Sequence, residues 1–424
     1  MYSTIIGEIM SKVIKVSDEI FDKQLEHLPK DVKFCKNCVV SNQRPRIKWD
    51  IKEEGVCSAC DYAYEKDNEI DWDQREKELQ KVCDTYRSKD GSWDVIVPSS
   101  GGKDSGMVAH KLKYKYGMHP LTITWAPFIY TDIGWKNFIA LKDCGFDNIL
   151  VHSDGKLHRK LSLLAFDLHG DAWDPFGYGQ EYLAYHLSVK YNIPLIFFGE
   201  NGEVEYGGED KHKNMVKAPM EDWEEIFYKG SSAQKLVDAG LKRNIFTREE
   251  IASSSFDFYK PPRKEDLERV GCAGHWMSYY ERWTPQWNYY YAVENTGFIA
   301  NDDRSEGTYQ KYGSIDDKLD GFHWWMAYMK FGICRATYDA AHEIRDGHIN
   351  RDEAVALVHK YDGEFPQKYW KEFLDYLDIT EKEFWYVADK FRSRHIWEPT
   401  GAKFAGYSPE AQYKLWKLKY LVDY

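Results

Sequence analysis

Long apolar runs are absent from this sequence of 424 residues. No stretch approaches the roughly 20 consecutive apolar residues that a membrane-spanning helix requires, so the sequence predicts no membrane partner. The first 24 residues mix acids and lysines among their apolar positions and lack the apolar centre of a secretory signal. We therefore expect a cytoplasmic protein.

Positive charge is also in short supply. Lysine and arginine together number 57 against 69 aspartates and glutamates, which leaves a formal net charge of −12. Because nucleic-acid binding relies on neutralising phosphates with cations, this balance argues against nucleic acid as a partner. Cysteines number only eight, and in the cytoplasm they favour metal sites or buried thiols over disulfides.

Half of the cysteines occur as two closely spaced pairs. Cys35 and Cys38 form one Cys-x2-Cys unit, Cys57 and Cys60 form the other, and 18 residues lie between them. This spacing is typical of a tetrahedral zinc site with four thiolate ligands. Since sulfur takes every position, no place is left for a substrate, and we expect a structural Zn²⁺. An iron–sulfur centre or a redox dithiol is the alternative.

Short apolar segments alternate with longer amphipathic segments from residue 93 onward. The apolar segments are 95–97, 121–125, 148–151 and 194–198, and the amphipathic ones are 105–116, 134–144, 156–168 and 179–191. Buried strands that alternate with helices are typical of a parallel, doubly wound α/β sheet. Ligands of such sheets bind at the carboxyl ends of the strands.

Composition divides the chain into four regions. The sheet domain is predicted at 91–215, after an N-terminal region, 1–90, that holds the zinc knuckles at 31–62 and a polar helix at 72–87. Residues 216–270 are rich in Gly, Lys, Glu and Ser and form an excursion that we expect to be partly mobile. Residues 271–424 are aromatic-rich and mostly helical, and acids after Asn350 mark one helix start.

The first apolar segment of the sheet leads directly into SSGGKDS at 99–105. A strand that enters a helix through such a turn presents several backbone N–H groups in one concavity, and glycine permits a close approach. Lys103 adds a positive charge, so the stretch predicts a phosphate site. It is not a Walker loop, because Asp104 follows the lysine where that motif has Ser or Thr, and it is not Gly-x-Gly-x-x-Gly.

The order SGGKDS between a strand and a helix resembles the pyrophosphate loop of the N-type ATP pyrophosphatases. These enzymes hold the β,γ-diphosphate of ATP as a leaving group and transfer AMP. The resemblance implies an ATP site that contains Ser99, Ser100, Gly101, Gly102, Lys103, Asp104 and Ser105.

Individual roles follow from the same resemblance. Lys103 neutralises developing charge, and Asp104 holds Mg²⁺ or, alternatively, only caps the helix. Thr124 and Trp125 end the second strand, which is where such folds place adenine.

Longer motifs narrow the resemblance. Four segments follow one another along the chain. They are CKNCVVSNQRPRIKWDIKEEGVCSAC, WDVIVPSSGGKDS, PLIFFGENGEVEYGG and YGSIDDKLDGFHWWMAYMKFGICRATYDAAHEIRDGHINRDEAVALVHKYDGEFP. In this order they resemble the N-acetyl sugar amidotransferase family, which makes acetamidino sugars for lipopolysaccharide and flagellar glycans. The resemblance begins near residue 33 and is silent on 1–30, a short strand or helix of unassigned role.

This family resemblance implies a reaction. The amide oxygen of an acetamido sugar nucleotide attacks the α-phosphorus of ATP, diphosphate leaves, and ammonia then displaces AMP from the O-adenylyl imidate. The substrate is a UDP-linked mannuronic acid derivative or a nonulosonic acid. Tyr2 excludes a cysteine nucleophile at position 2, and GCAG around Cys272 lacks the spacing of a glutaminase elbow. We therefore expect ammonia from a separate glutaminase partner.

Other candidates for the site lie beyond the loop. Glu200 follows a strand and is expected to be catalytic, with Asn201, Glu205 and Tyr206 as weaker candidates. Lys330 is expected to close over phosphate from the C-terminal region, or else to be a solvated surface charge.

Arg335 carries the same two alternatives as Lys330. Asp316, Asp317 and Lys318 contact the sugar nucleotide or only form a turn, and His342 and Arg345 are expected to decorate the surface of a helix; these assignments rest on position alone.

Two other functions stay open. A tRNA-thiolating ATP pyrophosphatase can also carry zinc knuckles, although the acidic net charge and the lack of a catalytic cysteine pair argue against it. A zinc-stabilised scaffold that binds nucleotide without turnover is the non-enzymatic alternative.

Overall fold

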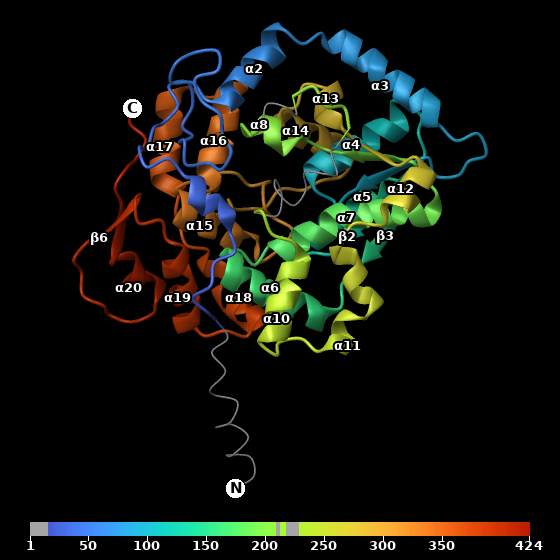
Figure 1. Cartoon of the computed structure of the whole chain (residues 1–424). Helices are drawn as coiled ribbons and strands as arrows, with labels where there is room; N and C mark the ends of the chain where they lie inside the picture. The colour runs from blue at the N-terminus through green and yellow to red at the C-terminus, as the bar shows by residue number, and fades with distance from the viewer. Residues whose placement is uncertain (1–15, 209–212, 218–228) are drawn as a thin grey trace.

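The computed structural model describes residues 16–208, 213–217 and 229–424 (Figure 1). Its centre is a five-stranded sheet in the order β3-β2-β1-β4-β5, and every neighbouring pair is parallel. The strands are β1 (Val95–Pro98), β2 (Pro120–Trp125), β3 (Asp147–Val151), β4 (Leu195–Phe198) and β5 (Ala273–Trp276). The predicted parallel α/β sheet is confirmed, and β1 lies in the middle of it.

Alternating side chains let each strand serve two cores. Val95 and Val97 of β1 pack into the core on one face, whereas Ile96 between them packs into the core on the other, as the two-residue period of a strand requires. The first face is covered by α3 (Trp72–Tyr86), α4 (Lys103–Tyr114), α5 (Asp132–Asp143) and α13 (Met277–Tyr280). The second is covered by α6 (Gly155–His169), α7 (Asp174–Tyr191) and α10 (Ala233–Lys242).

Helix ends follow local capping rules. The carboxylate of Asp154 accepts backbone N–H bonds at the start of α6, and Gly170 closes that helix with a left-handed φ of 64°; both arrangements are common caps. The predicted helix at 179–191 begins earlier, at Asp174, where Pro175 occupies the first turn. Proline is favoured there because its missing N–H has no intrahelical partner.

The sheet extends beyond residue 215, which was the predicted end of the sheet domain. Strand β5 pairs with β4 along Leu195–Phe198. The segment that leads to it contains α10, α11 (Arg248–Ile251), η3 (Ser254–Tyr259) and α12 (Lys264–Val270). The predicted mobility of 216–270 falls partly on 218–228, which lie outside the described residues.

The C-terminal region is helical, as predicted, and packs around an aromatic core. Phe322, Trp325 and Phe384 are each at most 1% exposed; Phe322 meets Phe384 edge to face, and the Trp325 ring is tilted by 30° to the Phe384 ring. In Figure 1 the helices after residue 319 run from orange to red beside the sheet domain. The helices of the C-terminal region are α14 (Pro285–Asn295), α15 (Asp320–Phe331), α16 (Arg335–Arg345), α17 (Arg351–Tyr361), α18 (Trp370–Leu377), α19 (Glu381–Phe391) and α20 (Pro409–Tyr413), with η4 (Gln367–Tyr369), β6 (Trp397–Pro399) and β7 (Trp416–Leu418). Within the described part of the chain, no helix is long and apolar enough to cross a bilayer.

The N-terminal region bridges the two larger parts. It contains η1 (Lys23–His27) and α2 (Ser58–Asn68), and its cysteine knuckles share a core with α16 and α17. On its other side, Arg46 and Lys66 form ion pairs of 2.7 Å with Glu203 and Glu205 of α8 (Gly202–Glu205), the turn that follows β4. The N-terminal region therefore joins the C-terminal helices to the carboxyl end of the sheet.

Removing one partner of a buried ion pair leaves an uncompensated charge. The Lys66 and Glu205 side chains are only 2% and 1% exposed, so we expect Lys66→Met to lower the free energy of unfolding by about 3–5 kcal/mol. Lys52→Met is the matched control, since the ion pair between Lys52 and Glu69 is solvent-exposed and is expected to contribute less than about 1 kcal/mol. Urea denaturation measures both, and equal effects would contradict this account.

Candidate functional site

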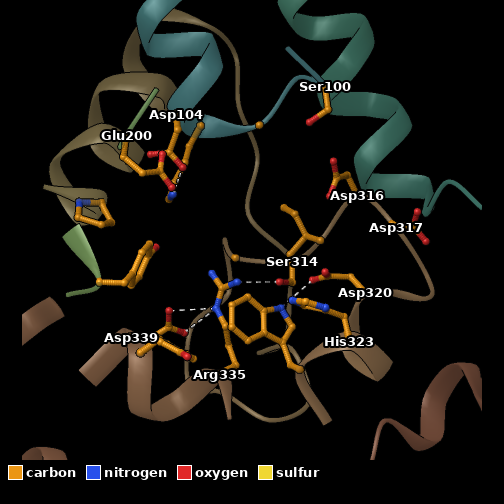
Figure 2. Close-up of a pocket in the computed structure, with 18 of the residues that line it drawn as sticks. Ser100, Asp104, Glu200, Ser314, Asp316, Asp317, Asp320, His323, Arg335 and Asp339 are labelled. Atoms are coloured by element: carbon orange, nitrogen blue, oxygen red, sulfur yellow. Dashed lines mark hydrogen bonds and ion pairs between the residues drawn. The ribbon is translucent and has the colours of Figure 1, made fainter. Parts of the chain in front are cut away.

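A cavity of about 660 Å³ opens at the carboxyl ends of β1, β2 and β4. This is the edge at which parallel α/β sheets bind ligands. One wall is the 98–105 turn after β1, and the opposite wall comes from α15, α16 and the 310–317 segment. Figure 2 shows polar side chains from both walls facing the space between them.

The turn after β1 requires glycine at one position. Gly101 has a φ of 89°, and a Cβ atom there would lie 2.5 Å from the backbone nitrogen of Phe138 in α5. The next residue, Gly102, is the N-cap of α4. The first turn of a helix has N–H groups without intrahelical acceptors, so the turn and α4 together form a cradle for an anion.

Hydrogen bonds of serine side chains stabilise the turn. The hydroxyls of Ser99 and Ser105 lie 2.9 Å apart, and the Ser99 hydroxyl also accepts the Gly101 N–H at 3.4 Å. Ser100 and Asp316 of the opposite wall both line the cavity. All seven residues of the predicted ATP loop line the cavity, yet their role in binding ATP stays a prediction.

The charged residues of the loop are paired with one another. The Lys103 ammonium forms an ion pair with the Asp104 carboxylate, whose other oxygen accepts a 3.0 Å bond from the Asn288 amide. Glu200, after β4, lies beside Asp104 in the cavity (Figure 2). Burial and the charge of Asp104 raise the pKa of Glu200 to about 7. A carboxyl group with such a pKa exchanges protons readily near neutral pH.

The two residues predicted at the adenine have different surroundings. The Thr124 hydroxyl donates to the Ser99 carbonyl and so braces the turn. The Trp125 ring packs edge to face on Tyr259, with centroids 5.8 Å apart. Both line the cavity, and the adenine contact stays a prediction.

Arg335 reaches the cavity from α16. Its guanidinium donates to Asp339 at 3.0 Å and to the Ser314 hydroxyl at 2.9 Å, and it lies 4.7 Å from the centre of the Trp324 ring (Figure 2). It is therefore a fixed, partly buried cation and not a solvated one.

Lys330 lines the cavity but its charge is already paired. Its ammonium, 2% exposed, contacts Asp22 at 2.9 Å and the His169 carbonyl at 3.2 Å. The alternative of a solvated surface charge is wrong. Because Asp22 lies 308 residues earlier in the chain, no local sequence pattern predicts this ion pair.

The three charged candidates at 316–318 lie in different places. Asp316 and Asp317 line the cavity, and the Asp317 carboxylate also accepts backbone N–H bonds from Phe128 and Leu319. Lys318 instead extends over the Tyr369 ring, 5.5 Å from its centre. Asp317 thus both forms the turn and lines the cavity.

His342 and Arg345 do not decorate a surface. His342 is 5% exposed and lines the cavity, and Arg345 donates to the Glu205 carbonyl at 3.2 Å. A usable signal existed in the sequence: Arg335, Asp339 and His342 are spaced i, i+4 and i+7, which places three polar side chains on one helix face.

The weaker candidates after β4 fall into two groups. Tyr206 lines the cavity. Asn201 caps α8 through its side chain, and Glu205 pairs with Lys66, so these two hold the wall in place.

The four paired cysteines meet in one buried cluster, as predicted. Their sulfur atoms all lie within 4.8 Å of one another, and the Cys35–Cys60 and Cys38–Cys57 sulfurs are 3.8 and 3.7 Å apart. A tetrahedron of thiolates at 2.3 Å from zinc has edges of about 3.8 Å. The cluster therefore fits a structural Zn²⁺ with no open position.

Comparison with known families connects the C-terminal wall to a biological process. Residues 306–407 match the family model described as "LPS biosynthesis protein WbpG-like, C-terminal domain". This segment contains α15, α16 and most of the wall opposite the glycine turn. The match points to an enzyme of lipopolysaccharide biosynthesis. No curated protein matches the chain.

If the cluster binds zinc for stability alone, Cys57→Ser should remove metal and stability together. We expect less bound zinc and a free energy of unfolding lower by several kcal/mol, which corresponds to a fall in Tm on the order of 10 °C in a chain of this size. Metal analysis and calorimetry measure the two. Cys144→Ser, a half-buried thiol outside the cluster, is the control, and an unchanged Tm after full metal loss would refute a structural role.

Proposed function

We propose that this protein is an ATP-dependent, AMP-forming amidotransferase. It converts the acetamido group of a nucleotide-activated sugar into an acetamidino group, with ammonia from a partner glutaminase. One observation carries the proposal: the SSGGKDS turn and the segment that resembles an LPS biosynthesis domain line the same cavity. A phosphate cradle thus faces the part of the chain related to sugar synthesis.

The nucleotide binds with its outer phosphates in the cradle after β1. The N–H groups at the start of α4 and the Lys103 ammonium supply positive charge for the diphosphate that leaves. Lys103 exchanges its Asp104 partner for phosphate oxygens, and the freed Asp104 carboxylate suits Mg²⁺, which prefers oxygen ligands. Mg²⁺, when bound, neutralises phosphate charge beside this carboxylate.

The sugar nucleotide occupies the remainder of the cavity. Trp173, Phe176 and Trp324 offer aromatic faces to a base or sugar ring, and Asp316 and Asp317 offer acceptors for hydroxyl groups. Arg335, which is held by Asp339 and Ser314, is placed to pair with an anionic group of the substrate. The cavity volume is within the range of small-molecule sites.

Activation precedes nitrogen transfer. An amide carbonyl is a weak electrophile, so its oxygen first attacks the α-phosphorus and displaces diphosphate, which yields an O-adenylyl imidate. Ammonia then adds to the imidate carbon, and AMP leaves with the electron pair of the C–O bond. The chain contributes positioning and electrostatic stabilisation and needs no covalent nucleophile.

Ammonia comes from outside this chain. Cys272, in the GCAG sequence, contacts the Ser188 hydroxyl at 3.1 Å, and burial raises the pKa of its thiol. A glutaminase needs a reactive thiolate, and Cys272 has the opposite environment. A separate glutaminase therefore supplies the nitrogen.

Mass spectrometry tests the proposed reaction. The protein is incubated with ATP, Mg²⁺, ammonium chloride and a panel of UDP- and CMP-linked acetamido sugars. We expect AMP, diphosphate and one sugar whose mass has changed by replacement of O with NH. ADP and orthophosphate as products would refute the proposal, and sulfur transfer to tRNA would establish the thiolating alternative.

Lys103→Ala should lower sugar-dependent AMP formation by about 100-fold or more, because it removes charge stabilisation at the leaving diphosphate. Lys115→Ala is the matched control, since Lys115 caps the far end of the same helix and is 50% exposed. Initial rates of AMP release and the Tm of both variants are measured. Full activity of Lys103→Ala would show that the turn does not bind the reacting phosphates.

A further inference from the structure

His342 is a buried polar side chain that the proposed reaction has not yet used. It projects from α16 into the cavity wall and is 5% exposed, and neither ring nitrogen has a hydrogen-bond partner among the described residues. Leaving a buried donor or acceptor unsatisfied costs about 1–3 kcal/mol. The position therefore calls for a small polar ligand.

Tyr206 connects His342 to Glu200. The rings of Tyr206 and His342 meet edge to face with centroids 4.8 Å apart. Glu200 lines the same cavity as Tyr206, and burial and then the negative charge of Glu200 raise the pKa of the Tyr206 hydroxyl. His342, Tyr206 and Glu200 thus form one corner of the cavity, beside Asp104 and Lys103.

The charges around this corner favour a neutral ligand that donates hydrogen bonds. Burial and four cations, Arg345, Lys66, Lys103 and Arg335, lower the pKa of His342 well below its ordinary value. The ring is therefore neutral and offers one acceptor nitrogen. Within the described residues, one buried oxygen of Asp346, which also lines the cavity, has no partner either.

A second cavity adjoins this side of the site. It has a volume of about 430 Å³ and lies between α4 and the start of α14, where Met107, Lys111 and Thr284 line it. Trp283 and His348 line both cavities. The two cavities are therefore neighbours, and these two residues lie between them.

We propose that this corner binds the ammonia that attacks the activated sugar: His342 positions it by accepting an N–H bond, and Glu200 moves its proton. The inference rests on the proposed function. Neutral ammonia is the nucleophilic form, and its N–H groups suit the acceptor nitrogen of His342 and the buried oxygen of Asp346.

The proton transfer balances within the corner. The ammonia lone pair forms the new C–N bond at the imidate carbon, which leaves a positive charge on the attacking nitrogen and a negative charge on the imidate nitrogen. Glu200 takes a proton from the former and returns it to the latter. The C–O bond then breaks with its electron pair on AMP, and the product is an amidinium ion.

Coupling between AMP formation and amidine formation tests the ammonia site. In wild type, each AMP should accompany one amidine. In His342→Leu, which has no acceptor, AMP formation should persist within a fewfold, while the amidine yield per AMP falls by about tenfold, which corresponds to one lost hydrogen bond of about 1.4 kcal/mol. The untransferred imidate is lost to water, which regenerates the acetamido sugar.

Two further variants test whether a lower amidine yield reflects misfolding. His342→Ala leaves space for added imidazole, which should restore the amidine yield only if the protein is folded. His359→Gln, on the exposed side of α17, should keep full coupling.

The pH dependence separates the roles of the two residues. With free ammonia held constant, amidine formation should rise through pH 7 as Glu200 ionises, because burial, Asp104 and Glu205 raise the pKa of Glu200 and Lys103 opposes them. Glu200→Gln should remove this rise and lower the yield by about 100-fold.

The outcomes are distinguishable. Wild type that forms no sugar-dependent AMP overturns the proposed function together with the inference. Normal AMP formation with an unchanged amidine yield in His342→Leu overturns the ammonia site alone. Equal loss of AMP and amidine in that variant also overturns it, since His342 would then serve an earlier step.

Discussion

The backbone turn between β1 and α4 is the constraint on which the rest of the structure depends. Gly101 adopts a φ of 89° against the backbone of α5, where no Cβ atom fits. This close approach aims the first turn of α4, with Lys103 and Asp104, at the carboxyl edge of the sheet. Every other wall of the cavity is built around the position that this turn sets.

Buried ion pairs hold those walls at a fixed separation. Lys66–Glu205 joins the cysteine knuckles to the end of β4, and Lys330–Asp22 joins α15 to the N-terminal segment. Such pairs contribute little net stability because both charges lose their hydration, but they penalise any arrangement that separates them. The four-cysteine cluster packs against α16 and α17, so three regions distant in sequence act as one frame.

The cavity separates two kinds of chemistry by charge. Around the glycine turn, backbone N–H groups and Lys103 suit the developing charge of a leaving diphosphate. Around His342, the same cations keep the imidazole neutral, while the pKa of Glu200 lies near 7. In the proposed reaction, activation by ATP and nitrogen transfer use adjacent parts of one site.

The sequence by itself determined the parallel sheet, the four-cysteine cluster and the glycine turn, because strand alternation, Cys-x2-Cys spacing and a Gly-Gly turn are local patterns with local physical causes. Only the tertiary structure decided that β5 completes the sheet, that Lys330 is neutralised by Asp22, and that His342 faces the cavity. These features depend on contacts between residues up to 308 positions apart. The burial of a charge or an imidazole is set by what packs on it, and nothing within its own helix specifies that neighbour.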